Sequence, residues 1–207
     1  MELLLVRHAL PQRVEGADGP ADPALADLGV RQAEALAGGL AGEPLHAVYT
    51  SPLRRAVETA APLAARTGLG PVVDEDLAEF DRDASEYIPI EELRAAGDPR
   101  WQAMVDGRYV GAEHLDPEAW RATVVAAVER IVEAHPGQVV AVVCHGGVVN
   151  AYLSWVLRTP DPMFFEPAYA SISRVLAARS GQREVRSVNE TAHVRGLLPG
   201  WGAKARP

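Results

Sequence analysis

The chain has 207 residues and one cysteine, with 48% hydrophobic residues, 23% charged residues and a formal net charge of −8 at pH 7. These values are typical of a single soluble domain with a sizeable core, and they argue against nucleic acid or an anionic membrane surface as a partner. The single cysteine, Cys144, excludes an intrachain disulfide. Because the sequence shows neither a signal-peptide pattern nor a long apolar run, we expect a cytoplasmic protein without a membrane span.

The first half of the sequence alternates short apolar runs with amphipathic helical patterns. Leu3–Val6 is an apolar run that predicts a buried strand, and Arg7 and His8 follow it directly. We then expect a loop over 10–26, a helix over 28–40 that Asp27 caps, and a strand over 45–50. A second helix should begin at Ser51 and Pro52 and end near Gly68, with a kink or break at Pro62. A short strand over 71–74 follows it.

The second half begins with a segment of different character. Residues 75–118 are charged, aromatic and weakly periodic, with short helical pieces around 90–96. We interpret them as an insertion or cap over the candidate site that is described below. The elements expected after it are a helix over 117–134, a strand over 138–143, a helix over 148–157, an antiparallel edge hairpin formed by 171–178 and 183–188, and a flexible tail from about residue 199. The whole pattern predicts an α/β fold with a mostly parallel sheet.

Polar residues follow three of the predicted strands, where each strand passes into a helix. These junctions carry Arg7 and His8, then Ser51 to Arg55, then His145 with Gly146 and Gly147. Because the carboxyl ends of parallel strands meet at one edge of a sheet, two histidines and at least two arginines should converge there. Helix N-termini add unpaired N–H groups and partial positive charge, so the sequence predicts a pocket for a compact anion such as phosphate.

Two other chemistries are less favoured by the same residues. A zinc site would place a cation beside arginines, and the chain contains no H-E-x-x-H spacing, so we expect no catalytic metal. A cysteine phosphatase loop would need an arginine six positions after Cys144, where Asn150 stands instead. Cys144 also ends a buried strand, where a free cysteine is usually a packing residue.

Histidine remains as the candidate nucleophile. Its ring must be neutral, and neighbouring arginines favour the neutral form by lowering the histidine pKa. The arginines and the second histidine would hold the oxygens of the transferred phosphoryl group. A general acid is also needed for the leaving oxygen, and the carboxylates after the third strand are all candidates at this point: Glu75, Asp76, Glu79, Asp81, Asp83 and Glu86.

Four segments of the chain resemble, in order, the motifs of the histidine phosphatase superfamily, whose members are phosphoglycerate-mutase-like. They are Leu5–Ala9, Leu25–Ala33, Ser51–Ala60 and Val143–Gly147. The resemblance implies a three-layer α/β/α sandwich formed by a single domain over 1–207, and a phosphohistidine intermediate on His8.

The resemblance also implies roles for the other site residues. The family's pocket arginine stands just before the alanine, which selects Arg55 over Arg54, and the phosphate would be held by Arg7, Arg55 and His145. The family's Leu-x-Glu motif matches Leu77-Ala78-Glu79, which selects Glu79 as the acid. The chain departs from the family at Ala9, Pro11 and Val14 and in the segment 80–84, so a specific substrate cannot be transferred from relatives.

Three functions are compatible with this pattern. The first is a metal-independent phosphatase without a cofactor that acts on a small phosphomonoester, with a phosphoprotein as the less favoured substrate. The alternatives are a phosphoglycerate-type mutase and a non-catalytic phosphate-binding module. The aromatic residues of 75–118, namely Phe80, Tyr87, Trp101 and Tyr109, would either contact the substrate or pack locally. The sequence does not indicate the oligomeric state and leaves a dimer open.

Overall fold

The computed structural model describes residues 1–112, 114–159 and 163–198, and the expected flexible tail from about residue 199 lies outside them. A six-stranded sheet in the order β3-β2-β4-β1-β5-β6 forms its centre. The strands are β1 (Glu2–Arg7), β2 (Leu45–Thr50), β3 (Val72–Val73), β4 (Val139–Cys144), β5 (Ile172–Ala177) and β6 (Arg183–Glu190). β1 to β4 run parallel, and β5 and β6 form an antiparallel hairpin beside β1. The predicted mostly parallel sheet with an antiparallel edge is confirmed.

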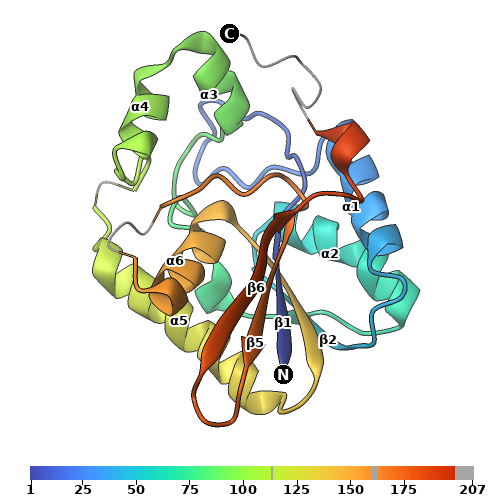
Figure 1. Cartoon of the computed structure of the whole chain (residues 1–207). Helices are drawn as coiled ribbons and strands as arrows, with labels where there is room; N and C mark the ends of the chain where they lie inside the picture. Colours follow the sequence, from blue (N-terminus) through green and yellow to red (C-terminus); the bar gives the residue numbers. More distant parts are fainter. Residues whose placement is uncertain (113, 160–162, 199–207) are drawn as a thin grey trace, which may run out of the picture.

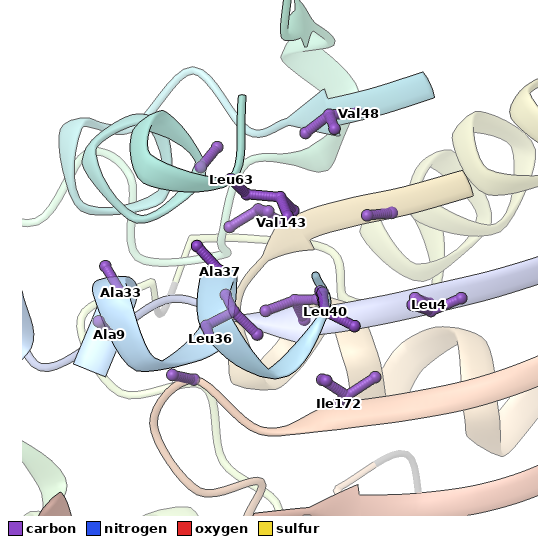
Figure 2. Close-up of a cluster of buried hydrophobic side chains, with 14 of the residues drawn as sticks. Leu4, Ala9, Ala33, Leu36, Ala37, Leu40, Val48, Leu63, Val143 and Ile172 are labelled. Atoms are coloured by element: carbon purple, nitrogen blue, oxygen red, sulfur yellow. The ribbon is translucent and has the colours of Figure 1, made fainter. Parts of the chain in front are cut away.

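Helices cover both faces of this sheet (Figure 1). α1 (Asp27–Gly39) and α2 (Arg54–Thr67) lie on one face, and α5 (Pro117–Ala134) and α6 (Gly146–Leu157) lie on the other. Figure 2 shows Leu36 of α1 and Leu63 of α2 among buried strand residues such as Leu4 and Val143. The predicted three-layer arrangement is therefore present.

The strand β1 contributes to the core on both of its faces. Its even-numbered residues Leu4 and Val6 belong to the cluster under α1 and α2. Leu3 and Leu5 belong to the second cluster, where they meet residues of α5 and α6 such as Val128. Successive side chains of a strand point to opposite faces, so a strand covered on both sides needs a continuous apolar run.

Several element boundaries differ from the sequence predictions. α2 begins at Arg54 instead of at Pro52, because Leu53 is extended (φ −68°, ψ 135°) and is the N-cap of the helix. α2 also continues through Pro62 without a break. Asp27, the predicted cap of α1, is instead its first helical residue, and the N-cap of the helix is Ala26. α6 begins two residues earlier than predicted, at Gly146.

Two short helices stand above the carboxyl ends of the parallel strands (Figure 1). α3 (Ile90–Ala96) matches the predicted helical piece, whereas α4 (Pro99–Val105) was not predicted. Its signal was present in the sequence, since Asp98 caps the Arg100 N–H at 2.9 Å and Pro99 occupies the first helical position. No helix in the described ranges is long and apolar enough to cross a membrane.

Candidate active site

The site lies where the direction of the sheet connections reverses. β1 and β4 are neighbours, but α1 follows β1 on one face and α6 follows β4 on the other. Such a reversal opens a crevice at the carboxyl ends of the strands. Arg7 is level with Cys144 in the pairing register, so His8 and His145 leave the sheet side by side. Their ring centroids are 5.1 Å apart.

His8 is buried, and a backbone carbonyl fixes the orientation of its ring. Nδ1 lies 2.8 Å from the carbonyl oxygen of Ala9. Because a carbonyl only accepts, Nδ1 carries the proton of the neutral ring and Nε2 keeps its lone pair. Burial and the neighbouring cations Arg55 and Arg7 hold the pKa of His8 well below its ordinary value. The ring is therefore neutral near pH 7, as a histidine nucleophile requires.

His145 is fully buried and is oriented by Ser51. The His145 Nε2 atom lies 2.7 Å from the Ser51 hydroxyl, which itself accepts the Leu53 N–H at 3.3 Å. In the tautomer in which the hydroxyl donates to Nε2, the ring proton lies on Nδ1. Burial, and the charges of Arg55, His8 and Arg7, lower the pKa of His145. A neutral His145 then offers one N–H donor next to His8.

The two adjacent arginines at the start of α2 have opposite environments. Arg55 is 1% exposed, and its Nη2 donates to Asp81 Oδ1 at 2.9 Å. Arg54 is exposed and pairs with Glu58 one helical turn later. Only one of the two faces the site, as expected for neighbours on a helix. That residue is Arg55, the one selected by the resemblance.

Arg7 closes the opposite side of the crevice. Its guanidinium donates to the carbonyl of Pro167 and stacks over Tyr169, with 3.9 Å from the guanidinium carbon to the ring centroid. The described residues provide no hydrogen-bond partner for three buried nitrogens around His8: Nε of Arg7, Nε of Arg55 and Nδ1 of His145. Buried donors of this kind are suited to the oxygens of an anion such as a phosphoryl group.

Glu79 reaches the site from the segment after β3. Its Oε2 accepts the Gly147 N–H at 2.7 Å, and its Oε1 accepts the Phe80 N–H at 3.1 Å. Burial and the negative charge of Asp81 raise the pKa of Glu79 to about 7. A carboxyl group with such a pKa can give up and take back a proton near neutral pH.

The other candidate acids are placed less suitably. Glu75 and Asp76 pair with exposed arginines, Arg82 and Arg130 respectively. Asp83 is exposed. Asp81 and Glu86 line the cavity, but each is paired with an arginine, Arg55 and Arg100 respectively.

A cavity of about 450 Å³ connects these groups. Arg7, His8, Arg55 and Glu79 line it, and the His145 ring lies beside that of His8 with its Nδ1 buried and unpartnered among the described residues. Thus the structure brings all five predicted site residues together. Cys144 is fully buried, and burial raises the pKa of its thiol, as expected for a packing residue. Within the described ranges no three His, Cys, Asp or Glu side chains are grouped to hold a metal ion.

Sequence reasoning covered Thr59 only as part of a motif and Tyr87 only as an aromatic of 75–118, and it missed how both position the reacting groups. Thr59 accepts the Ala9 N–H at 2.9 Å and donates to the carbonyl of Arg55 at 2.6 Å, so it links the end of β1 to α2. Its spacing of four residues from Arg55 was the available signal. Tyr87, whose ring lies 4.8 Å from the Arg55 guanidinium carbon, is held by backbone hydrogen bonds to Val14. That pairing over a long sequence separation has no local signal.

The fold and the site together define an α/β protein with a phosphate-type pocket that contains a neutral histidine and an acid with a raised pKa. The model of the histidine phosphatase superfamily (branch 1) matches residues 3–191. The chain therefore belongs to this superfamily, and the expected resemblance is confirmed.

Relatives and solved structures agree with this membership. The chain is 33% identical over 201 residues to the bifunctional protein Rv2228c of Mycobacterium tuberculosis, and the match covers 93% of the chain but only 54% of that relative. It is 30% identical over 151 residues to phosphoserine phosphatase 1 of Hydrogenobacter thermophilus, covering 70% of the chain and 71% of that protein. Other relatives are named as phosphoglycerate mutases or mutase-like.

Among solved structures, the mycobacterial glucosyl-3-phosphoglycerate phosphatase Rv2419c in complex with inorganic phosphate is similar to the chain. The TM-score is 0.72 at 25% identity, and the match covers 93% of this chain and 99% of that one. The names of these similar proteins include both phosphatases and mutases.

Proposed function

We propose that the protein is a metal-independent phosphatase that hydrolyses phosphomonoesters through a phosphohistidine on His8. The observation that carries this proposal is the environment of His8: a neutral ring held by the Ala9 carbonyl, beside two arginines and in the same cavity as Glu79. Arginines at the site repel a metal cation, so the positive charge that the phosphoryl group needs comes from the protein itself.

In the first half of the reaction, the lone pair of His8 Nε2 attacks phosphorus. The bond from phosphorus to the ester oxygen breaks, and Glu79 gives its proton to that leaving oxygen. Arg7, Arg55 and the Nδ1–H of His145 hold the remaining phosphoryl oxygens. His8 keeps its Nδ1 proton, and the Ala9 carbonyl stabilises the positive charge of the phosphorylated ring.

The second half of the reaction uses the same residues in reverse roles. The Glu79 carboxylate takes a proton from water, whose oxygen attacks phosphorus and displaces His8 Nε2. Inorganic phosphate leaves, and both side chains return to their starting protonation states. A carboxyl group with a pKa near 7 serves in both directions.

The phosphoenzyme is the direct test of this proposal. Incubation with a labelled phosphoester should give an acid-labile, base-stable label that His8→Ala cannot form. His114→Ala, at an exposed histidine that does not line the cavity, is the matched control and should keep the label. Activity should persist with a chelator present. If His8→Ala retained the label, the assignment of the nucleophile would be wrong.

The mutase alternative is supported by the relatives named as mutases. A mutase would convert 3-phosphoglycerate to 2-phosphoglycerate when bisphosphoglycerate is present, whereas a phosphatase releases inorganic phosphate. The non-catalytic alternative would show as binding of phosphate or vanadate without turnover of any phosphomonoester. One panel of substrates, followed by phosphate release and product analysis, separates the three functions.

A further inference from the structure

We infer, on the basis of the proposed function, that the substrate is a small phosphomonoester with an uncharged, apolar or aromatic leaving group. A phosphoryl group bound by Arg7, Arg55 and His145 would occupy one end of the cavity. The volume of about 450 Å³ is in the range of pockets that bind drug-sized molecules, so the remaining space is suited to a sizeable leaving group. The chemistry of its walls then indicates what that group is.

The wall formed by α4 is the strongest observation. Trp101, Met104 and Val105 stand at positions i, i+3 and i+4 of this helix, and all three line the cavity. None of the residues of α4 is fully buried, and Val105 is 55% exposed. The apolar face of α4 is therefore turned towards the cavity without being buried by the protein core. An apolar leaving group would cover this face and remove it from water.

Apolar residues of neighbouring elements also line the cavity. Ile90 and Leu93 of α3 line the cavity at positions i and i+3, and Phe164 lines it from the segment after α6. Tyr87 also lines the cavity, with its ring 6.4 Å from that of His8 and 4.8 Å from the Arg55 guanidinium carbon. Aromatic side chains so placed favour stacking with an aromatic leaving group.

The charged residues of the outer cavity disfavour a second anionic group on the substrate. Arg100 is bound by Asp98 at 2.8 Å and by Glu86 at 2.5 Å, and Arg108 pairs with Asp106 at 3.4 Å. A substrate carboxylate would therefore have to compete with two carboxylates at Arg100, whereas the exposed Arg108–Asp106 pair offers little competition. It would also face the negative charges of lining residues such as Glu86 and Glu166.

The test compares phosphomonoesters that differ only in the leaving group. We expect kcat/KM to rise about tenfold or more from phenyl phosphate to 1-naphthyl phosphate. We expect it to fall by a similar factor when phenyl phosphate carries a carboxylate, and phosphoserine and 3-phosphoglycerate should be poor substrates. Equal or better use of the carboxylate-bearing esters would overturn the inference, as would a preference for a phosphotyrosine peptide over the small aryl esters.

Variants of α4 locate the effect in the structure. Trp101→Ala and Met104→Ala should lower kcat/KM for 1-naphthyl phosphate about tenfold while leaving kcat/KM for ethanolamine phosphate within about threefold. Gln102→Ala is the matched control, because Gln102 is an exposed residue of the same helix that does not line the cavity. A similar loss for both esters would show that the apolar face of α4 does not contact the leaving group.

A binding measurement separates this inference from the proposed function. Calorimetry with 1-naphthyl phosphonate and with its carboxylated analogue reports affinity whether or not the protein turns over an ester. Tighter binding of the compound without the carboxylate, weakened by Trp101→Ala, would support the inference even if no phosphatase activity were found. Tighter binding of the carboxylated compound would refute it even if the phosphatase activity were established.

Discussion

A single methyl group at Gly147 should disable the proposed general acid without removing any reacting group. Gly147 is the second residue of α6, and its N–H donates to Glu79. A Cβ atom at this position would lie 2.3 Å from Oε1 of Glu79 and 2.9 Å from its Cδ. Both distances are too short for non-bonded atoms, so Gly147→Ala must displace the Glu79 carboxyl group.

The size of the effect follows from this geometry. To restore normal contact, the carboxyl group has to move by about 1 Å. A displacement of about 1 Å costs on the order of 10²-fold in rate, which is at the low end of what a general acid contributes. We therefore expect kcat/KM for alkyl phosphates to fall about 10²-fold, or about 2.7 kcal/mol in transition-state stabilisation. The free energy of unfolding should change little, because alanine stabilises a helix by about 1 kcal/mol relative to glycine and offsets a lost hydrogen bond.

Steady-state kinetics with a series of leaving groups measures this effect. An activated ester such as p-nitrophenyl phosphate needs little protonation of its leaving oxygen, so its rate should fall less than about tenfold. Gly38→Ala is the matched control, since Gly38 is a helical glycine of α1 that does not line the cavity and a Cβ there would meet nothing within 4 Å. Equal losses for alkyl and p-nitrophenyl esters in Gly147→Ala would refute the role of Glu79 as the acid.

Two further predictions concern pH. Because Glu79 acts in its protonated form, kcat/KM should decrease as the pH rises through about 7, and Glu79→Gln should lack this decrease. As the pH falls, kcat/KM should decrease again because His8 becomes protonated, but only well below pH 6.5. Asp81→Asn removes a negative charge that raises the pKa of Glu79. The decrease of kcat/KM with rising pH should therefore begin at a lower pH in this variant than in the unchanged protein. Asp81→Asn also frees Arg55 from its carboxylate partner, so inhibition by inorganic phosphate should become about two- to fivefold stronger. An unchanged pH–rate profile and an unchanged inhibition constant would contradict both effects.

The parts of the fold that local pattern determines were predictable from the sequence. The apolar run of Leu3–Val6 is a strand covered on both faces, and such burial requires apolar residues at every position. Helical periodicity likewise limits the pocket-facing arginine to one of two neighbours, and Arg55 is the buried one. The convergence of His8 and His145 followed from the parallel arrangement of their strands.

The details that depend on tertiary contacts were not predictable in the same way. Ser51 has the sequence context of a helix cap, but its hydroxyl contacts His145, and the helix starts three residues later, at Arg54. Tyr87 reaches the site because its backbone pairs with Val14, one of the positions that depart from the family pattern. The role of α4 was hidden for another reason. Its seven residues are too few for a clear periodic signal, and its apolar face lines a cavity instead of the core.

The reacting groups and the leaving-group walls of the site are subject to different constraints. His8 and His145 follow strands whose register is fixed by core residues on both faces of the sheet, so a change there moves the reacting atoms. Trp101 and Met104 lie on a short helix without fully buried residues, and they can change without disturbing that register. Leaving-group preference should therefore vary with substitutions in α4, while the chemistry at His8 continues.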